Sequence, residues 1–278
     1  MFDAKVILDS ISPAGVRLTT MEVTFPRMIL AEFNTHRVFS RNSASSRAIP
    51  VEKMLHKVID DTFIPVYWGK NQKGMQAEQE LTLEEQIIAT NTWLTGRDLV
   101  VAQVNKLLAL GVHKQIANRL LEPWLFHTVL VSATEWENFF ALRTDKNAQP
   151  EMQAIAKLML WAYETSEPKQ LDYGHWHMPL MPDLKELEQI YGKQDLLKIS
   201  IGRCARVSYL THHGARDPMV DIDLCCKLIA SGHMSPTEHV ARPLGGLDSA
   251  RLWSGNFRGW EQYRKTIKNE ANFGARRN

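Results

Sequence analysis

One short segment, residues 35–47, constrains this chain more than any other because it gathers cations, hydroxyl groups and an amide without an acidic residue. It reads Thr-His-Arg-Val-Phe-Ser-Arg-Asn-Ser-Ala-Ser-Ser-Arg. A strand-like stretch ending near Leu30 precedes it, so we expect its donors at the end of a sheet element, where they can converge on a phosphate. Composition alone favours a basic surface loop. The choice between the two depends on the spacing of the polar residues.

Length and composition admit a folded protein with a sizeable core. The chain has 278 residues, of which 44% are hydrophobic, enough for one large domain or two small ones. The net charge of +2 is close to neutral. A nucleotide would therefore have to be held by a local cluster of charges, and a general DNA-binding protein is disfavoured.

Three features bear on where the protein works. Residues 1–12 mix Asp3, Lys5 and Asp9 with apolar residues, which suits a first strand and not a signal peptide. The sequence contains no apolar run long enough to span a membrane. Two of the three cysteines are adjacent, which does not suit a disulfide framework. We expect a cytoplasmic protein without a membrane partner.

Periodicity predicts an α+β fold, with an antiparallel or mixed sheet packed against a helical layer. Strands are expected over residues 4–11 and 16–30, with Pro26 interrupting the second. Residues 68–80 read as a loop. Helices are predicted over residues 51–61, 82–110, 113–121, 135–141, 149–164, 183–191 and 221–231. We expect a single domain over 1–278, with residues 167–182 as the candidate internal boundary.

The spacing within residues 35–47 resembles the signature of the flavin-dependent thymidylate synthases, Arg-His-Arg-x-x-Ser-x-Asn-Glu-x-Ser-x-Arg-Tyr. The chain departs from it at Thr35, Ser43 and Ala48, which stand where the family has Arg, Glu and Tyr. The positions that agree are His36, Arg37, Ser40, Asn42, Ser45 and Arg47.

Two further segments are similar to elements of the same family. Residues 138–143 and 148–151 match Asn-Phe-x-x-Leu-Arg followed by Ala-Gln-x-Glu, whose Arg meets the pyrimidine base. Taken alone, the first segment favours an amphipathic helix with Arg143 paired to Asp145. Residues 117–123 resemble Ala-Arg-x-x-Leu-Pro, whose Arg binds the nucleotide phosphate, and Arg119 is the matching position.

The end of the chain carries two more similar elements in an unexpected place. Residues 205–209 and 232–239 resemble Ala-Arg-Val-Ser-Tyr and His-x-Ser-Pro-Phe-Glu-His, which in the family precede the signature. Here they follow it, so the resemblance has a circularly permuted order, which is plausible where termini lie close together. This order predicts that Val240 lies near the strand starting at Val16. Residues 132–134, Ser-Ala-Thr, replace a flavin-contacting Asn-x-Arg of the family.

The resemblance implies methylation of dUMP to dTMP without a cysteine nucleophile, with FAD and NADPH, and methylenetetrahydrofolate as carbon donor. It also implies a homotetramer with sites at subunit interfaces and no stable nucleic-acid partner. Arg143 is the catalytic candidate, because a fixed guanidinium can stabilise charge on the ring oxygens. The implied flavin contacts are His36, Arg37, Asn42, Asn138 and His239. The implied substrate contacts are Glu32, Ser43, Ser45, Arg47, Arg119 and Arg143.

Two alternatives stay open. Glu32 stands where the family has a Gln, and Ser43 replaces its Glu, so another pyrimidine nucleotide or a hydroxymethylated product is a second reading. A third is a flavin-free protein that binds nucleotides or single-stranded nucleic acid through the Arg-rich segment and the aromatic residues Trp260 and Tyr263. A helix docked on the domain equally explains residues 256–265.

Histidine pairs and cysteines do not predict further chemistry. His175, His177 and the pair His212-His213 could suggest a metal, but no Cys or carboxylate completes a recognisable ligand set, and Pro179 and Pro182 crowd the first pair, so no metal is expected. Cys204 lies in an apolar stretch and is predicted to be a buried hydrophobic residue. The adjacent cysteines at 225 and 226 are expected in the core of a helix.

Overall fold

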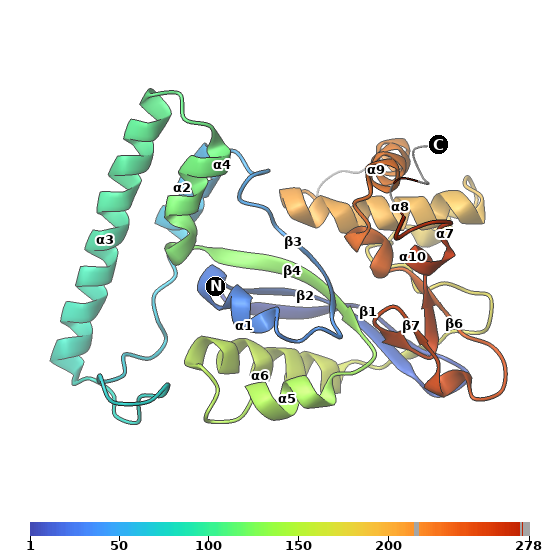
Figure 1. The fold of residues 1–278 in the computed structure, drawn as a ribbon, viewed down its shortest axis with the longest axis horizontal. Coiled ribbons are helices and arrows are strands. Elements are labelled where there is room, and N and C mark those ends of the chain that lie inside the picture. Colours follow the sequence, from blue (N-terminus) through green and yellow to red (C-terminus); the bar gives the residue numbers. More distant parts are fainter. Residues whose placement is uncertain (214–216, 273, 275–278) are drawn as a thin grey trace.

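The computed structural model describes residues 1–213, 217–272 and 274, and a five-stranded mixed sheet lies at its centre (Figure 1). The strand order is β3-β4-β2-β1-β5. The long strands β1 (Asp3–Ile11), β2 (Arg17–Pro26) and β4 (Phe126–Ala133) are antiparallel. At the edges, β3 (Ser40–Ser43) pairs antiparallel with β4, and β5 (Lys169–Gln170) pairs parallel with β1. The expected α+β class is confirmed.

The second strand ends earlier than predicted. It stops at Pro26 and not near Leu30, and a 3-10 turn over Arg27–Ile29 leads into the short helix α1 (Leu30–Phe33). A proline lacks the N–H donor that would continue the ladder. The basic segment contributes the edge strand β3 in place of a simple loop, pairing with β4, which the sequence analysis did not predict.

Most of the predicted helices are present with small shifts in their ends. They are α2 (Val51–Asp60), α3 (Leu83–Ala109), α5 (Glu137–Arg143), α6 (Pro150–Thr165) and α9 (Pro218–Ser231). The predicted capping box begins α3, because the Glu85 N–H donates to Thr82 Oγ1 at 3.3 Å and the Thr82 N–H donates to Glu85 Oε2 at 2.8 Å.

Two helical predictions were wrong, and one helix was missed. The helix expected over 113–121 is the single turn α4 (Lys114–Ala117), followed by a 3-10 helix over Asn118–Trp124 that includes Pro123. The helix expected over 183–191 is confined to α7 (Leu184–Leu187). The 14-residue helix α8 (Lys193–Arg206) was not predicted. Because α8 is buried on several sides, its sequence lacks the single apolar stripe of a surface helix.

Helices α8 and α9 pack closely, and the contact depends on a glycine and a buried carboxylate. A Cβ atom on Gly202 would lie 2.3 Å from the backbone oxygen of Asp221, so only glycine allows this approach. The Asp221 carboxylate is fully buried and pairs with Arg203, at 3.3 Å, and with Arg206. Arg206, which lies within the Ala-Arg-Val-Ser-Tyr-like element, is therefore part of the packing between the two helices.

The two faces of the sheet are covered by different parts of the chain. Helix α6 packs across β1 and β2 on one face, and α5 packs on α6 (Figure 1). The C-terminal part, which begins with α8, covers the other face. It adds two small hairpin-like sheets and a last helical turn, namely β6 (Ala241–Pro243) with β9 (Trp260–Gln262), β7 (Trp253–Ser254) with β8 (Phe257–Arg258), and α10 (Tyr263–Thr266).

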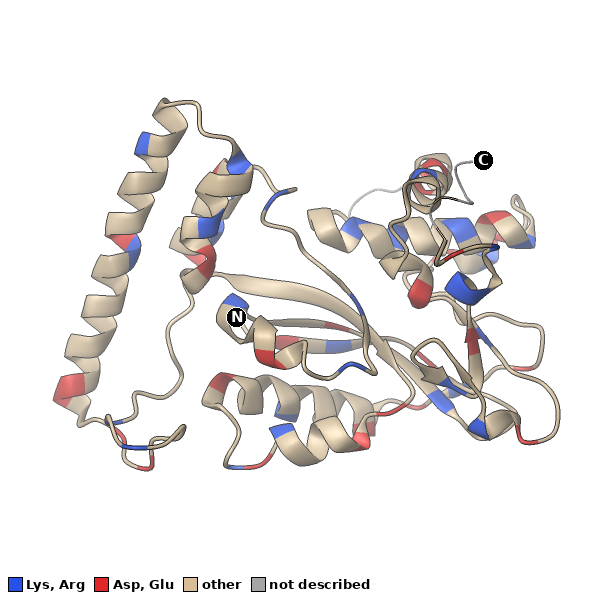
Figure 2. Cartoon of the chain, in the orientation of Figure 1, with Lys and Arg blue, Asp and Glu red and all other residues tan. Residues whose placement is uncertain are grey.

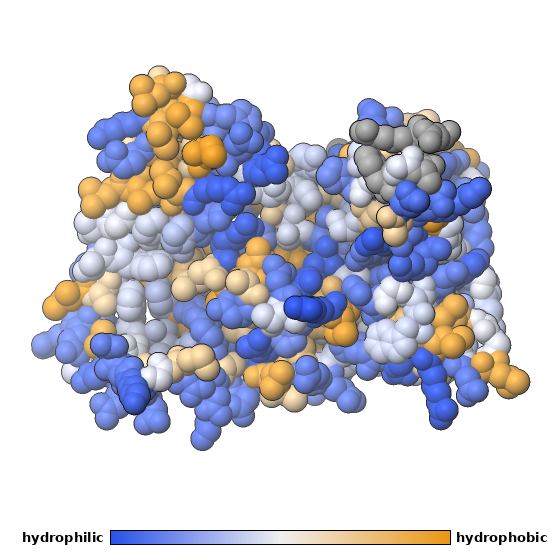
Figure 3. All heavy atoms as spheres, in the orientation of Figure 1, coloured by the Kyte–Doolittle hydropathy of each residue, from blue (hydrophilic) through white to orange (hydrophobic). Residues whose placement is uncertain are grey.

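Helix α3 contributes little to the core of the chain. Of its residues only Val104 is buried, and it packs mainly beside the 3-10 helix Asn118–Trp124. Apolar residues gather on its outer surface toward its C-terminal end (Figure 3). Of the exposed large apolar side chains, Leu99 and, just beyond the end of the helix, Leu110 lie in its C-terminal half, whereas Leu83, Ile87 and Ile88 lie near its N-terminal end. No helix within the described residues is long and apolar enough to cross a membrane.

The cysteines are only partly where the sequence placed them. Cys204 and Cys225 are buried, as predicted. Cys226 is exposed, so the expectation that both adjacent cysteines lie in a core is wrong. On a helix with one buried side, two consecutive residues point in different directions.

Candidate active site

The segment from Asn34 to Pro50 carries positive charge along its whole length. Figure 2 shows blue and no red between α1 and α2 on this stretch, which contains Arg37, Arg41 and Arg47. Its contacts with the rest of the chain fall into three groups. The first group joins two predicted residues, the second contains two, and the third contains one.

In the first group, Arg143 at the end of α5 reaches back to the start of the basic segment. Its Nε–H donates to His36 Nε2 at 2.8 Å, and its Nη2 donates to Thr35 Oγ1 at 3.1 Å. Thr35 is itself fixed, because its hydroxyl donates to the backbone oxygen of Glu32 at 2.6 Å. Arg143 therefore pairs with these two residues, and the simpler expectation of a pair with Asp145 does not describe the structure.

The charge state of His36 follows from its surroundings. Burial, together with the positive charges of Arg143 and Arg41, lowers the pKa of His36 to about 4. The imidazole is therefore neutral near pH 7, and its Nε2 can accept the Arg143 hydrogen bond. Packing fixes the ring, since it stacks near Phe39 and lies edge-on to Phe139 at a centroid distance of 4.9 Å. The Arg143 guanidinium is therefore half-buried and is held in place by a hydrogen bond to a neutral histidine.

In the second group, the middle of the basic segment docks on the C-terminal part of the chain. The Asn42 side chain donates to the backbone oxygen of Cys204 at 2.6 Å and accepts a long hydrogen bond of 3.4 Å from Ser235. The Ser45 N–H donates to the backbone oxygen of Ser208 at 3.0 Å. The two late elements, residues 205–209 and 232–239, thus lie against the signature-like segment that precedes them in sequence.

The proximity predicted from the permuted order is confirmed at the residue after Val240. Ala241 packs with Val16 and Leu18 in one core cluster. Val240 itself packs in the neighbouring cluster with Trp176. The end of the second late element therefore lies beside the beginning of β2.

His239 lies in the same region, on a chain of buried polar groups. Its Nδ1 shares a hydrogen bond of 2.9 Å with Ser132 Oγ, and Thr20 Oγ1 links Ser132 to His177 Nε2, the latter at 2.8 Å. Burial lowers the pKa of His239 and of His177 to about 3, so both rings are neutral. Among the described residues, His239 Nε2 has no hydrogen-bond partner although it is buried. That nitrogen is the atom of His239 that could meet a ligand.

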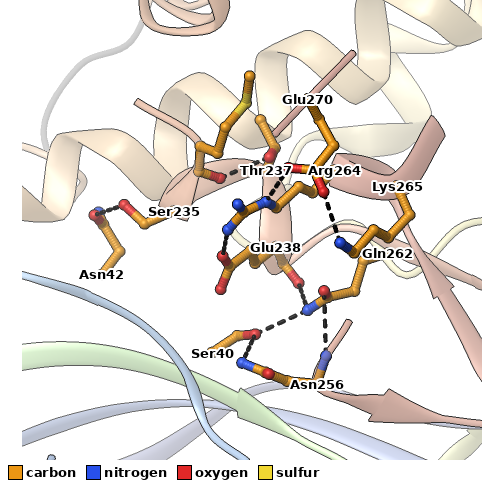
Figure 4. A network of polar contacts seen from close by, with 11 residues as sticks. Ser40, Asn42, Ser235, Thr237, Glu238, Asn256, Gln262, Arg264, Lys265 and Glu270 are labelled. Atoms are coloured by element: carbon orange, nitrogen blue, oxygen red, sulfur yellow. Dashed lines mark hydrogen bonds and ion pairs between the residues drawn. The ribbon is translucent and has the colours of Figure 1, made fainter. Parts of the chain in front are cut away.

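A polar network secures the C-terminal strands to Ser40, in the first half of the basic segment (Figure 4). Gln262 donates to Ser40 Oγ at 2.8 Å and to the backbone oxygen of Glu238 at 3.1 Å. Asn256 also donates to Ser40, at 3.3 Å, and Arg264 bridges Glu238 and Glu270. These contacts fix the turn that carries His239.

In the third group, a carboxylate stands beside Arg119, one of the three residues predicted to hold phosphate. Glu122 accepts a hydrogen bond of 2.9 Å from Ser46 and lies 3.7 Å from Arg119 and 3.5 Å from Arg27. A cavity of about 20 Å³, room for one water molecule, lies beside them, lined in part by Lys57 and His127. Sequence reasoning missed Glu122 and Arg27, because no local pattern connects them with residues 35–47.

The remaining predicted residues differ in how open they are. The side chains of Arg37, Arg47, Arg119 and Asn138 are exposed, and those of Ser43 and Ser45 are half-buried. Glu32 is half-buried, and its Oε2 atom is buried without a hydrogen-bond partner in the described part of the chain. Open cations and an unpaired buried oxygen are features that a bound nucleotide or cofactor could use.

The aromatic residues near the C-terminus are used inside the protein. Trp260 is fully buried, and its indole N–H donates to the backbone oxygen of Val16 at 3.1 Å. Tyr263 packs edge-on to Trp176 at 5.8 Å. Residues 256–265 form strands and one helical turn, so the docked-helix reading is wrong, and Trp260 cannot stack on a nucleic-acid base.

Comparison with known proteins gives one family. A model of the family described as thymidylate synthase complementing protein matches residues 11–169, more than half of the chain. No curated protein sequence matches the chain.

Solved structures with a similar fold have low identity and modest overlap. One is a UMP/dUMP methylase, PolB, from Streptomyces cacaoi bound with 5-Br UMP, at 14% identity over 59% of this chain and 88% of that chain, with a TM-score of 0.49. The same protein with 5-Br dUMP gives 13% identity, 59% and 90% coverage, and a TM-score of 0.48. Thymidylate Synthase X from Helicobacter pylori, with FAD and dUMP, gives 16% identity, 52% and 67% coverage, and 0.37.

Proposed function

The chain belongs to the thymidylate synthase complementing protein family, and from the site described above we propose that it methylates C5 of a pyrimidine nucleotide, most simply converting dUMP to dTMP. The observation that carries this proposal is the hydrogen bond from Arg143 to His36. It joins two of the family-like elements across 107 positions of sequence. Both elements lie within the residues that the family model matches.

Arg143 is the residue to which we assign the main catalytic role. Carbon 5 of uracil is a weak nucleophile, and its attack on a one-carbon donor requires stabilisation of negative charge on the ring oxygens. A guanidinium has five N–H donors in a fixed plane and keeps its charge. His36 and Thr35 each take one donor and hold the plane in place, and the others would face the base. Such preorganised donors stabilise charge as it develops.

The nucleotide phosphate is assigned to Ser45, Arg47 and Arg119. Arg119 is exposed and its nearest carboxylate, Glu122, is 3.7 Å away, which is a weak ion pair that a phosphate could replace. Charge-assisted hydrogen bonds from arginines and hydroxyls are the usual way to hold a phosphate. Ser43 and Glu32 are then left for the sugar and the base.

Fewer residues of a single chain are available for the flavin than the resemblance implies. Arg37 and Asn138 are exposed and could contact it directly, and the unpartnered Nε2 of His239 could accept or donate one hydrogen bond. Asn42 and His36 already bind other groups of the chain, so they would orient the surrounding backbone. Bound FAD would carry reducing equivalents from NADPH, and methylenetetrahydrofolate would supply the carbon.

We also propose that the complete site is assembled from several copies of the chain, as a homotetramer. Two observations support this. The predicted residues fall into three separate groups within one chain, and the hydrogen bonds and ion pairs of the described residues do not join the Arg143 group to the Glu122 group. The apolar surface of α3 offers an area that a second copy could cover (Figure 3).

Replacement of Arg143 tests the function. We expect Arg143→Ala to lower dTMP formation by roughly 10²–10³-fold while FAD stays bound, because one set of oxyanion-stabilising donors is lost. Arg143→Lys should not restore turnover, since an ammonium cannot reproduce the planar fork. Arg251→Ala, at an exposed arginine outside the site, is the matched control. Product would be measured by mass with dUMP, FAD, NADPH and methylenetetrahydrofolate, and near-normal turnover of Arg143→Ala would refute the assignment.

A second candidate keeps the chemistry and changes the substrate. The buried Glu32 Oε2 is an acceptor without a donor among the described residues, and the exocyclic amino group of a cytosine base could satisfy it where uracil has only an oxygen. Comparing products from dUMP and dCMP by mass distinguishes the two, and would also detect a hydroxymethyl group. Salt-sensitive oligonucleotide binding by a protein that takes up no FAD would instead favour the nucleic-acid reading.

A further inference from the structure

We propose that Glu22, His212 and His213 form a binding site for a divalent transition-metal ion of the Zn²⁺ class. The sequence predicts no metal site, because no Cys or carboxylate completes a recognisable ligand set with His212 and His213. The structure supplies the carboxylate from a distant strand. The proposal is independent of the methylation assigned above and of the residues that would perform it.

The three side chains converge on one point. Glu22 Oε1 lies 2.9 Å from His213 Nε2, and Glu22 Oε2 is in close contact with His212 Nε2. One ligand atom from each residue lies within 4.8 Å of the other two. The two imidazole rings lie 4.1 Å apart, tilted by 45°. A small adjustment would therefore place all three atoms at the distances of about 2.0–2.2 Å that Zn²⁺ requires.

The local backbone explains why consecutive histidines reach the same point. Leu210 has a left-handed conformation, with φ 53°, directly after the 3-10 turn Val207–Tyr209. The Thr211 N–H then bonds back to Arg206. In a strand, two consecutive side chains would point to opposite faces. In this irregular turn both can face Glu22.

Burial makes a cation useful at this place. Glu22 is only 9% exposed and lies in the middle of β2, with Lys5 and Leu130 as its partners across the sheet. His212 is 3% exposed, whereas the His213 side chain is 52% exposed. A carboxylate in such a position is costly without a positive partner. The open side at His213 leaves room for a metal ion to enter and keep a water ligand.

The ligand set selects the kind of metal. Two imidazoles and one carboxylate suit Zn²⁺, Co²⁺ or Fe²⁺, whereas Mg²⁺ and Ca²⁺ prefer all-oxygen sites. His212 Nδ1 is buried without a hydrogen-bond partner in the described part of the chain. Metal-binding histidines normally donate this second N–H, and its loss weakens binding by roughly 10–100-fold. We therefore expect weaker binding than at a site where both histidines have such a partner.

The alternative is that the three residues form only a hydrogen-bonded clamp between the C-terminal part and the sheet. Metal titration of the full chain distinguishes the two. After treatment with EDTA, the wild-type protein should bind one Co²⁺ per chain, give a visible absorption band of a four-coordinate ion, and release the Co²⁺ to added Zn²⁺. Its melting temperature should rise with Zn²⁺ concentration, because the ion binds the folded state.

Two variants locate the ion. His213→Ala removes a half-exposed ligand and leaves the Glu22–His212 contact in place, so the protein should fold and bind Co²⁺ more than about tenfold more weakly. His233→Ala, at another exposed histidine, should bind like the wild type. No binding by the wild type, or equal binding by the wild type and His213→Ala, would overturn the proposal. A matching loss in His233→Ala would do so as well, because the ion would then lie elsewhere.

Discussion

The central sheet presents two faces that are stabilised in different ways. On the face toward α5 and α6, β2 and β4 contribute Met21, Val23, Val129 and Val131 to one apolar core, with several aromatic rings around Phe25. On the opposite face, the same two strands carry polar side chains that are bonded to one another or to histidines from later parts of the chain. These are Thr20, Glu22, Thr24, Thr128 and Ser132.

The difference shows how the late segments of the chain are held in position. Apolar contact is non-directional and tolerates small shifts of α6 on the sheet. The polar face requires defined partners, since each unpaired buried group costs free energy. His239, His212 and His213 each meet one side chain of β2 or β4 on this face, and His177 meets Thr20 of β2 and Ser10 of β1. These contacts hold the late elements, residues 205–209 and 232–239, in one position against β2, the strand that precedes the signature-like segment.

The largest effect is expected on the apolar face. Phe25 is fully buried and contacts Phe33 at a centroid distance of 4.9 Å. Phe25→Ala should lower the free energy of unfolding by about 3–5 kcal/mol, from the lost transfer term and the cavity left behind. Urea unfolding followed by circular dichroism measures it. A loss below about 1 kcal/mol would mean that this face is not the main source of stability.

Acid should weaken the polar face next. The folded-state pKa of His177 and of His239 is lowered by burial to about 3, below the usual 6.5, so the unfolded state binds more protons between pH 6.5 and 3. The free energy of unfolding therefore falls as the pH drops through this window. From pH 7 to pH 5 each histidine should account for about 2 kcal/mol.

Urea unfolding at several pH values checks this slope. Glu22 does not titrate in measurements above pH 5, because its pKa is lowered to about 2. Burial alone would raise this pKa, but the hydrogen bonds from His212 and His213 outweigh that effect. A Met21→Leu variant of the apolar face should displace the whole curve and leave its slope unchanged. A stability that does not vary between pH 7 and 5 would contradict the neutral, buried state of both rings.

A smaller loss is expected when one hydroxyl is removed from the polar face. Ser132→Ala removes the partner of His239 Nδ1 and of Thr20 Oγ1. The free energy of unfolding should fall by about 1–3 kcal/mol, because buried polar groups are left unpaired. Since Thr20 and Ser132 share one network, the losses of Thr20→Val and Ser132→Ala should not add in the double variant. Strict additivity would show that the network does not act as a unit.

The smallest loss of unfolding free energy is expected at the half-buried edge of the same face. Thr24 Oγ1 and Thr128 Oγ1 share a hydrogen bond of 3.0 Å at part-buried positions. Thr24→Val keeps the shape and removes this bond, so the expected loss is within about 0.5–1.5 kcal/mol. Thermal unfolding of Thr24→Val and of Ser132→Ala, measured side by side, ranks the two losses of stability. A larger loss for Thr24→Val than for Ser132→Ala would reverse the proposed gradient from the centre of the face to its rim.

The apolar face was largely predictable from sequence, whereas the polar face was not. The alternation of Met21, Val23 and Phe25 predicts a strand with one apolar side, and the capping box at Thr82 and Glu85 predicts where α3 begins, because both signals are local. The partner of Glu22 lies 190 positions away. Helix α8 was missed because a helix buried on several sides has no single apolar stripe.

The same contrast holds within the candidate site. His36, Asn42 and Arg143 were singled out by their spacing, and the contact between His36 and Arg143 agrees with that choice. Glu122 and Arg27 were not found, since they reach the basic segment only through folding. Asn42 was expected to bind flavin, yet its amide is bonded to Cys204. Resemblance singles out candidate residues, and the packing determines which of them remain accessible.

The most direct test of the account is the visible absorbance spectrum of the purified full chain, supplied with FAD and then titrated with dUMP. The account predicts bound flavin whose bands shift when dUMP is added, with the shift lost in Arg143→Ala although FAD remains bound. A chain that takes up no FAD, or whose flavin bands do not respond to any pyrimidine nucleotide, would contradict the proposed methylation site.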